Sequence, residues 1–427
     1  MLRAARPRVG VSVARTWKSF HVSSAVYAFR KKSQEPADPS IFKRGTPKNK
    51  GWVDSFEDTA AYSRLRAKAP KLPEDAPGKE PLSANSAPGQ VYCIPDKADA
   101  VLRVIGSYRR NQKYELFADR PTLVRESTTV PVANMIKGLK PSKDNRVCVL
   151  GPLGVGKSTT LTQAHALAVE QGYIVLHVPR PIELVNGTTD AVYDDSLGHF
   201  AQPMYARRWL ARIARANREM LSTLPVTMEH KVTAGSKTQN LYELITQGRR
   251  KGPAQTLAAL VAELEAQTTA PVLFTMDDIN VFADHIYSEN RSTSNMPIYH
   301  GDLQVPHLFL EFLAGKRTFA KGAVMAAVSG SHRMNETILA GLSLTQPSPY
   351  AKIDRYDPNL AASFRGVGVL EVPRYSAEEA RASLEYWHQA QVIPEEILTE
   401  SYISQKYFVS GNGNPRELLR ACTELYV

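Results

Sequence analysis

The stretch that decides the fold is residues 147–167, which read VCVLGPLGVGKSTTLTQAHAL. A short apolar run at 146–150 leads into GPLGVGKS, which fits the phosphate-loop pattern G-x-x-x-x-G-K-S. A helix-forming stretch at 157–171 follows and ends before Gly172. A strand before the loop and a helix after it are the context that this motif requires. The stretch therefore predicts a phosphate-binding loop in a nucleotide-binding domain.

The residue types in this loop predict how a nucleotide is held. Glycines permit backbone conformations in which several N–H groups point inward, and these amides surround a phosphate together with the helix N-terminus. Lys157 is expected to neutralise the β- and γ-phosphate oxygens, and the Ser158 hydroxyl to coordinate Mg²⁺. The predicted nucleotide-binding residues of the loop are Gly151, Gly154, Val155, Gly156, Lys157, Ser158 and Thr159.

Two acids close a later apolar run, PVLFTMDD at 271–278. An acid at the carboxyl end of a buried strand beside a phosphate loop can hold Mg²⁺ through water, and we assign this role to Asp277. Asp278 is the candidate for orienting an attacking water. Many strong ATPases of this type have Glu there, and Asp is one methylene shorter. A cap on the following turn is the alternative role for Asp278.

Two more residues are predicted at the same site. Ser329 lies at the end of the strand predicted at 323–330, together with Ser331, and Arg416 follows Pro415 at the start of a C-terminal helix. Together with the loop and the acids they resemble the two sensor positions of AAA+ domains. No N/T-K-x-D element follows Asp278, which argues against a Ras-like GTPase and leaves ATP and GTP/GDP both open. The base is expected near residues 114–127.

Alternation of strand and helix signals predicts an α/β fold, a doubly wound parallel sheet of the P-loop, AAA+-like type. Apolar runs expected to be strands lie at 146–150, 173–178, 271–278, 323–330 and 368–372, with a helix at 254–267. The predicted organisation is a presequence at 1–34, an extended Pro/Gly-rich arm at 35–90, the nucleotide-binding domain at 91–345 with an insertion at about 181–253, and a mostly helical lid at 346–427.

Most of the positive charge lies at the N-terminus. The 427-residue chain has a net charge of +11, and residues 1–34 hold eight Lys and Arg and no acid, which leaves +3 for the rest. Arg-rich, acid-free sequence with interspersed apolar residues is typical of a mitochondrial presequence. A basic arm that binds nucleic acid is the alternative. No run of eighteen apolar residues predicts a membrane span.

The insertion contains a predicted amphipathic helix. Arg208, Arg212, Arg215 and Arg218 line one stripe of it, and Trp209, Ile213, Ala216 and Met220 another. Such a basic stripe is either solvated or a contact for RNA phosphates or an acidic partner.

The segments GPLGVGKST, LVNGTTD…FAQPMYARRWLARIARAN, VLFTMDDIN and GNPREL resemble the death-associated protein 3 family of the small mitochondrial ribosomal subunit. The resemblance covers most of residues 90–427. It implies a structural component of that subunit in the mitochondrial matrix, in contact with small-subunit ribosomal proteins and rRNA, that binds a purine nucleotide with Mg²⁺. The alternative is an active AAA+-like NTPase that remodels a protein or RNA partner.

Overall fold

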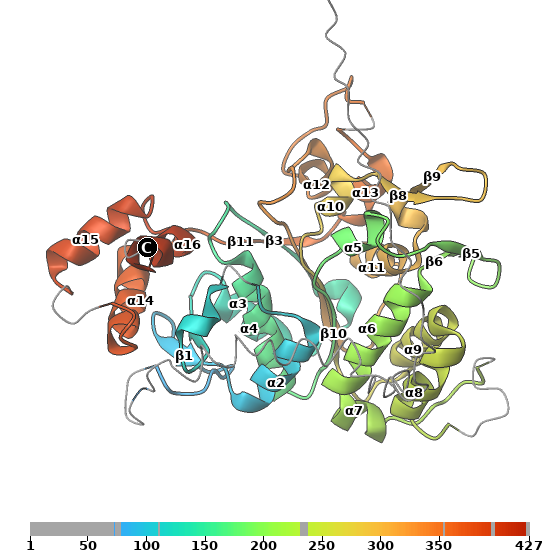
Figure 1. Cartoon of the computed structure of the whole chain (residues 1–427), viewed down its shortest axis with the longest axis horizontal. Helices are drawn as coiled ribbons and strands as arrows, with labels where there is room; N and C mark the ends of the chain where they lie inside the picture. Colours follow the sequence, from blue (N-terminus) through green and yellow to red (C-terminus); the bar gives the residue numbers. More distant parts are fainter. Residues whose placement is uncertain are drawn as a thin grey trace, which may run out of the picture. The chain divides into compact units, whose positions relative to one another are not determined.

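The computed structural model describes Leu72 and residues 78–109, 112–230, 238–352, 355–393 and 398–423 (Figure 1). The predicted presequence and most of the predicted arm lie outside these residues. Within the described ranges, no helix has both the length and the apolar character needed to cross a membrane.

A parallel five-stranded sheet forms the centre of the fold, in the order β11-β3-β10-β7-β4. Its strands coincide with the five apolar runs predicted from the sequence: β3 (Arg146–Leu150), β4 (Ile174–Val178), β7 (Val272–Met276), β10 (Gly322–Ala327) and β11 (Gly368–Glu371). Every residue of β4, β7 and β10 is buried, as expected for inner strands covered on both faces.

Helices cover both faces of this sheet (Figure 1). Successive strand residues belong to opposite cores, so that Val149 and Leu273 face one helical layer while Cys148 and Phe274 face the other. The first layer contains α2 (Asp96–Ile105), α3 (Thr129–Lys137) and α4 (Lys157–Glu170); the second contains α6 (Pro203–Ala216), α8 (Leu241–Lys251), α9 (Pro253–Ala266) and α11 (Gln304–Ala314). The predicted doubly wound α/β fold is confirmed.

Shorter elements connect these layers. Three antiparallel pairs lie outside the central sheet: β1 (Val91–Cys93) with β2 (Pro121–Leu123), β5 (Val192–Asp194) with β6 (His199–Ala201), and β8 (Tyr287–Arg291) with β9 (Pro297–Tyr299). The remaining short helices of this part of the chain are α5 (Ile182–Val185), α7 (Arg218–Thr223), α10 (Val281–Asp284), α12 (Glu336–Gly341), α13 (Pro358–Ser363) and the 3-10 turns Tyr114–Leu116, Ser142–Asp144 and His300–Asp302.

The insertion helix α6 differs from its prediction. Arg212 is buried on it, and burial lowers the pKa of its guanidinium group, against the opposing effect of Tyr205 and Glu183. Arg215 is exposed on α6. The helix ends at Ala216, and Arg218 begins α7, where it is exposed and lies over the Tyr242 ring. Helix α6 packs against β4, α2, α8 and α9. Its buried surface therefore extends beyond the apolar stripe that the sequence predicts and includes Arg212. The four arginines therefore do not form a single exposed face.

The C-terminal helices α14 (Ala377–Gln389), α15 (Glu400–Val409) and α16 (Pro415–Thr423) have a small core of their own. A capping box begins α14, where the Ser376 side chain accepts from the Glu379 N–H and the Glu379 carboxylate accepts from the Ser376 N–H. This helical unit follows residue 371, later than the predicted boundary at 345. The reason is that β11 pairs with β3, which makes residues 368–371 part of the central sheet.

Candidate nucleotide-binding site

Three neighbouring strands bring the predicted site together. Because β10 lies between β3 and β7 in a parallel sheet, the segments that follow these strands meet at one edge. A cavity of about 310 Å³ opens there. Its lining includes the predicted residues Gly154, Val155, Gly156, Lys157, Ser158, Thr159, Asp278, Ser329 and Arg416. Gly151 and Asp277 are not in the cavity lining. The Gly151 carbonyl accepts a hydrogen bond from Lys157, and the Asp277 carboxylate accepts one from Arg109; both of these donors line the cavity.

A second group of cavity residues is aromatic or apolar. Tyr114, Phe117 and Leu123 come from the segment at 114–127 where the base is predicted, and Tyr386 and Trp387 come from α14. The cavity thus combines a glycine-rich loop with flat aromatic surfaces, and a nucleotide needs both, one for its phosphates and one for its base.

The phosphate loop has the backbone conformation that its glycines predict. Gly151, Gly154 and Gly156 all have positive φ values, of 144°, 85° and 103°. The Lys157 ammonium donates to the carbonyls of Gly151 and Pro152, at 2.7 and 2.6 Å. Burial lowers the pKa of Lys157, and the nearby acids Asp277 and Asp278 oppose this effect. Lys157 is therefore folded over its own loop, where an incoming phosphate would replace the two carbonyls as its partner.

The C-terminal helical unit contacts this loop directly. The Asn414 side-chain amide donates to the Leu153 carbonyl at 2.8 Å, and the Arg416 N–H donates to the Gly154 carbonyl at 3.2 Å. A Cβ on Gly154 would lie 2.6 Å from Asn414 Oδ1 and 3.0 Å from Arg416 Cβ. The start of α16 thus packs so closely on the loop that only glycine fits at position 154.

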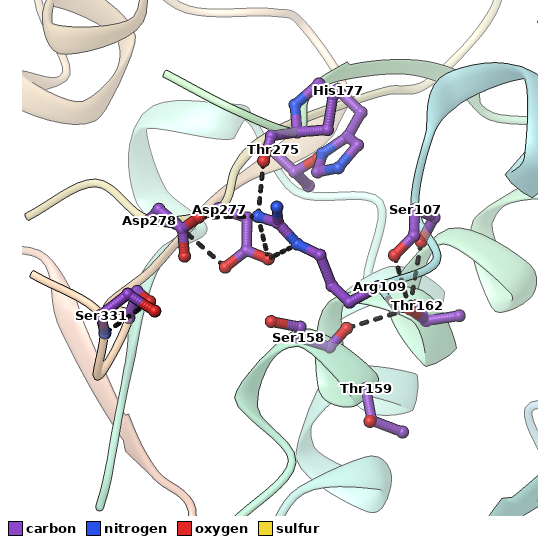
Figure 2. Close-up of polar contacts among 12 residues, drawn as sticks. Ser107, Arg109, Ser158, Thr159, Thr162, His177, Thr275, Asp277, Asp278 and Ser331 are labelled. Carbon is purple, nitrogen blue, oxygen red and sulfur yellow. Dashed lines mark hydrogen bonds and ion pairs between the residues drawn. The ribbon is translucent and has the colours of Figure 1, made fainter. Parts of the chain in front are cut away.

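Arg109 is the site residue that sequence reasoning missed. Its Nε and Nη2 donate to Asp277 Oδ2 at 2.9 and 2.7 Å, and Nη2 also donates to Asp278 Oδ2 at 3.0 Å and to the Pro179 carbonyl (Figure 2). Burial by itself would lower the pKa of Arg109, but attraction to the two carboxylates raises it. No motif marks Arg109, because it lies in an irregular segment between α2 and β2.

The two acids differ in environment. Asp277 is buried, and its Oδ1 accepts the Asp278 N–H at 3.0 Å. Asp278 has a φ of 57°, and burial together with the Asp277 charge raises its pKa, while Arg109 and Ser329 oppose the rise. Its carboxylate faces Arg109 and Ser329. This arrangement makes Asp278 an ion-pair partner of Arg109, so that one of its two oxygens already accepts a hydrogen bond from the guanidinium group.

Ser329 is held by another residue that the sequence did not single out. The Asn280 side chain accepts from the Ser329 N–H at 2.8 Å and donates to the carbonyls of Ser329 and His332 at 2.9 and 3.0 Å. Ser331, whose N–H donates to Ser329 Oγ, also lines the cavity. Asn280 thereby fixes the loop after β10 to the segment after β7.

A buried polar network lies behind the acids (Figure 2). His165 contacts Ser107 Oγ and Thr275 Oγ1, each at 2.8 Å, and His177 Nδ1 contacts the same Thr275 oxygen at 2.8 Å. Thr162 donates to the Ser158 carbonyl at 2.9 Å. Burial lowers the pKa of both imidazoles, that of His165 to about 3. The network joins α4, β4 and β7 to the segment that carries Arg109.

The predicted Mg²⁺ ligands are oxygen donors of the kind that Mg²⁺ prefers, Ser158 and Asp277. In the structure, however, both Asp277 oxygens already accept N–H groups, and Arg109 supplies the positive charge beside them. Asp277 Oδ1 accepts one backbone N–H, so it keeps a lone pair for a water of a metal ion, whereas Oδ2 is taken by Arg109.

A family model matches most of the chain. Residues 122–421 match the family described as mitochondrial ribosomal death-associated protein 3. The chain belongs to this family. The resemblance predicted from the loop, the acids and the insertion is thus confirmed, and the family places the chain among mitochondrial ribosomal proteins.

Relatives and solved structures are similar over most of their length. The small ribosomal subunit protein mS29 of Neurospora crassa is 28% identical over 81% of this chain and 78% of its own length. The protein of the same name from Schizosaccharomyces pombe is 26% identical over 80% and 72%. A Walker-type ATPase of Pyrococcus abyssi matches with a TM-score of 0.42 and 10% identity, over 76% of this chain and 71% of that one.

Proposed function

We propose that this chain is a structural protein of the small subunit of the mitochondrial ribosome, in the matrix, and that it holds a purine nucleotide as part of its fold. Its relatives from two fungi carry the name of that subunit protein. The nucleotide would occupy the cavity, with its phosphates against residues 151–159 and its base against the aromatic group. Small-subunit proteins and rRNA are the expected partners.

One observation favours a stably bound nucleotide rather than nucleotide hydrolysis: Arg109 is paired with both acids. Hydrolysis needs a carboxylate that orients water and a metal that bridges phosphates. Here Asp278 is bonded to Arg109, and Arg109 supplies charge where Mg²⁺ would lie. Mg²⁺ would be held by Ser158 directly and by Asp277 through water.

If the nucleotide is a permanent part of the fold, its binding should stabilise the folded chain. A ligand that binds only the folded chain raises its stability in proportion to the logarithm of the ligand concentration above Kd. At about 100 times Kd this amounts to about 2.7 kcal/mol. Within the structure the cavity joins the loop, the segment at 114–123 and the C-terminal helices, so one nucleotide would connect three parts of the chain.

Lys157→Ala tests this function, with Lys143→Ala as the matched control because Lys143 is exposed on the 3-10 turn Ser142–Asp144, outside the cavity lining. We expect Lys157→Ala to lose thermal stabilisation by ATP and GDP and, in sucrose gradients of mitochondrial extract, to leave the small-subunit fractions. Lys143→Ala should behave as wild type. Unchanged stability and incorporation with loss of NTP turnover would instead identify an active NTPase.

A further inference from the structure

A second cluster of metal-binding side chains lies beside the cavity. The cluster consists of Asp284 at the end of α10, His285 directly after it, and His332 in the loop after β10, and each residue offers one ligand atom. These atoms all lie within 4.8 Å of one another, and His332 Nδ1 is 3.4 Å from Asp284 Oδ2. Among the residues that the structure describes, this is the one group of three such side chains. We propose that it is a binding site for a transition-metal dication, with Zn²⁺ as the best fit.

The donor set selects the metal. Two imidazoles and one carboxylate are typical zinc ligands, whereas Mg²⁺ and Ca²⁺ prefer oxygen donors alone. In a tetrahedral zinc site, ligand atoms about 2.0–2.1 Å from the metal lie about 3.3 Å from each other. The Asp284–His332 distance of 3.4 Å is close to this value, and the His285 ligand atom lies within 4.8 Å of both. Water would take the fourth position.

Hydrogen bonds hold the two segments that carry the ligands. Asn280 donates to the His332 carbonyl at 3.0 Å, and Asn335 donates to the Ala283 carbonyl at 2.7 Å. The His285 N–H donates to the Val281 carbonyl at 2.7 Å. The ligands are therefore presented from backbones that are already fixed, which lowers the entropy that the metal would have to remove.

The location suggests what the metal does. Ser331, which lines the cavity, directly precedes His332. A zinc ion here would tie α10 to the loop after β10, and these segments present Asp278 and Ser329 to the cavity. Its role would be to fix that wall of the site, whether or not a nucleotide is bound.

The test measures zinc binding to the untagged full chain by equilibrium dialysis followed by elemental analysis. We expect one Zn²⁺ per wild-type chain, and an affinity lower by about tenfold or more in His285→Ala and His332→Ala, since even outer-shell losses cost about 10–100-fold. Thermal unfolding without metal identifies any variant that fails to fold. If an alanine variant fails to fold, the glutamine variant at the same position is tested instead. The zinc affinity of that glutamine variant then decides whether the histidine is a ligand.

The matched control is a second histidine pair on the surface. The rings of His199 and His307 are 3.9 Å apart, and His307 lies 3.4 Å from Glu311, yet no three ligand atoms converge there in the described structure. His307→Ala should keep the full zinc stoichiometry. Equal zinc binding by wild type and the folded His285 and His332 variants, or loss of zinc in His307→Ala alone, would overturn the proposal.

Two further measurements separate this site from the nucleotide site. Co²⁺ in place of Zn²⁺ should give visible d–d absorption of a tetrahedral nitrogen–oxygen site in wild type, and an octahedral aqua-type spectrum would contradict the assignment. Lys157→Ala should retain zinc, because Lys157 is no part of the ligand set. A wild-type chain that binds zinc but neither ATP nor GDP would reject the proposed function and leave the zinc site standing.

Discussion

Arg109 and Asp277 are 168 residues apart in the sequence, yet two nitrogens of the Arg109 guanidinium donate to one Asp277 oxygen. Asp277 is buried and Arg109 mostly so. A second acid, Asp278, shares the same guanidinium. The single charge of the arginine thus offsets one of the two negative charges at the acidic end of β7.

Replacing Arg109 should lower the free energy of unfolding. Arg109→Ala leaves a buried carboxylate unpaired, which typically costs about 3–5 kcal/mol of unfolding free energy. We also expect nucleotide affinity to become strongly dependent on Mg²⁺, because the ion must then supply the missing charge. Urea unfolding and fluorescent-nucleotide titrations with Mg²⁺ or EDTA measure both effects. Arg381→Ala, which breaks an exposed ion pair with Glu400, is the control and should change neither. Affinity that is equally insensitive to Mg²⁺ in both variants would refute this role.

Gly154→Ala should detach the C-terminal helices from the loop. The added methyl meets Asn414 and Arg416, and the φ of 85° is strained for alanine. Gly172→Ala is the matched control, because its φ of 72° carries a similar strain of about 1–2 kcal/mol but its Cβ meets nothing within 4 Å. Thermal unfolding and nucleotide titration should therefore show a larger loss for Gly154→Ala. Equal effects in the two variants would mean that the packing of α16 on the loop contributes nothing.

Stability should fall as the pH drops below about 6.5. His165 and His177 are held neutral in the folded chain because burial lowers their pKa, whereas in the unfolded chain they titrate near 6.5. Below that pH the unfolded state binds more protons, and each histidine removes up to about 1.4 kcal/mol per pH unit until its folded pKa is reached. Urea midpoints between pH 7.5 and 5 measure this slope. It should be shallower in His165→Gln and unchanged in His307→Gln.

Trp209 should be essential for stability although it lies in the insertion. It is 2% exposed, stacks with Phe274, and donates from Nε1 to the His177 carbonyl at 2.9 Å. Trp209→Ala is expected to cost about 3–5 kcal/mol. Met204→Ala on the same helix should stay within about 0.5 kcal/mol, because Met204 is exposed. A small loss for Trp209→Ala in denaturant unfolding would mean that the insertion is a separate unit.

Much of the fold could be predicted because its signals are local. The runs at 146–150 and 271–278 are strands because continuous apolar sequence must be buried on both faces of a parallel sheet. The sequence predicts a strand at 368–372 but not its partner, because the pairing of β11 with β3 joins segments about 220 residues apart. The basic stripe on α6 was predicted from periodicity, which cannot reveal how many neighbours a helix packs against.

The sequence by itself determined the family, the strand–loop–helix motif and the acids at the end of β7, because each depends on residue types at fixed spacing. Only the tertiary structure decided what those acids contact. Arg109, Asn280 and the buried histidines carry no spacing signal, and they reach the site because parallel strands bring their carboxyl ends to one edge. A buried carboxylate without a partner costs free energy. At this edge of the sheet, Arg109 is the ion-pair partner of Asp277.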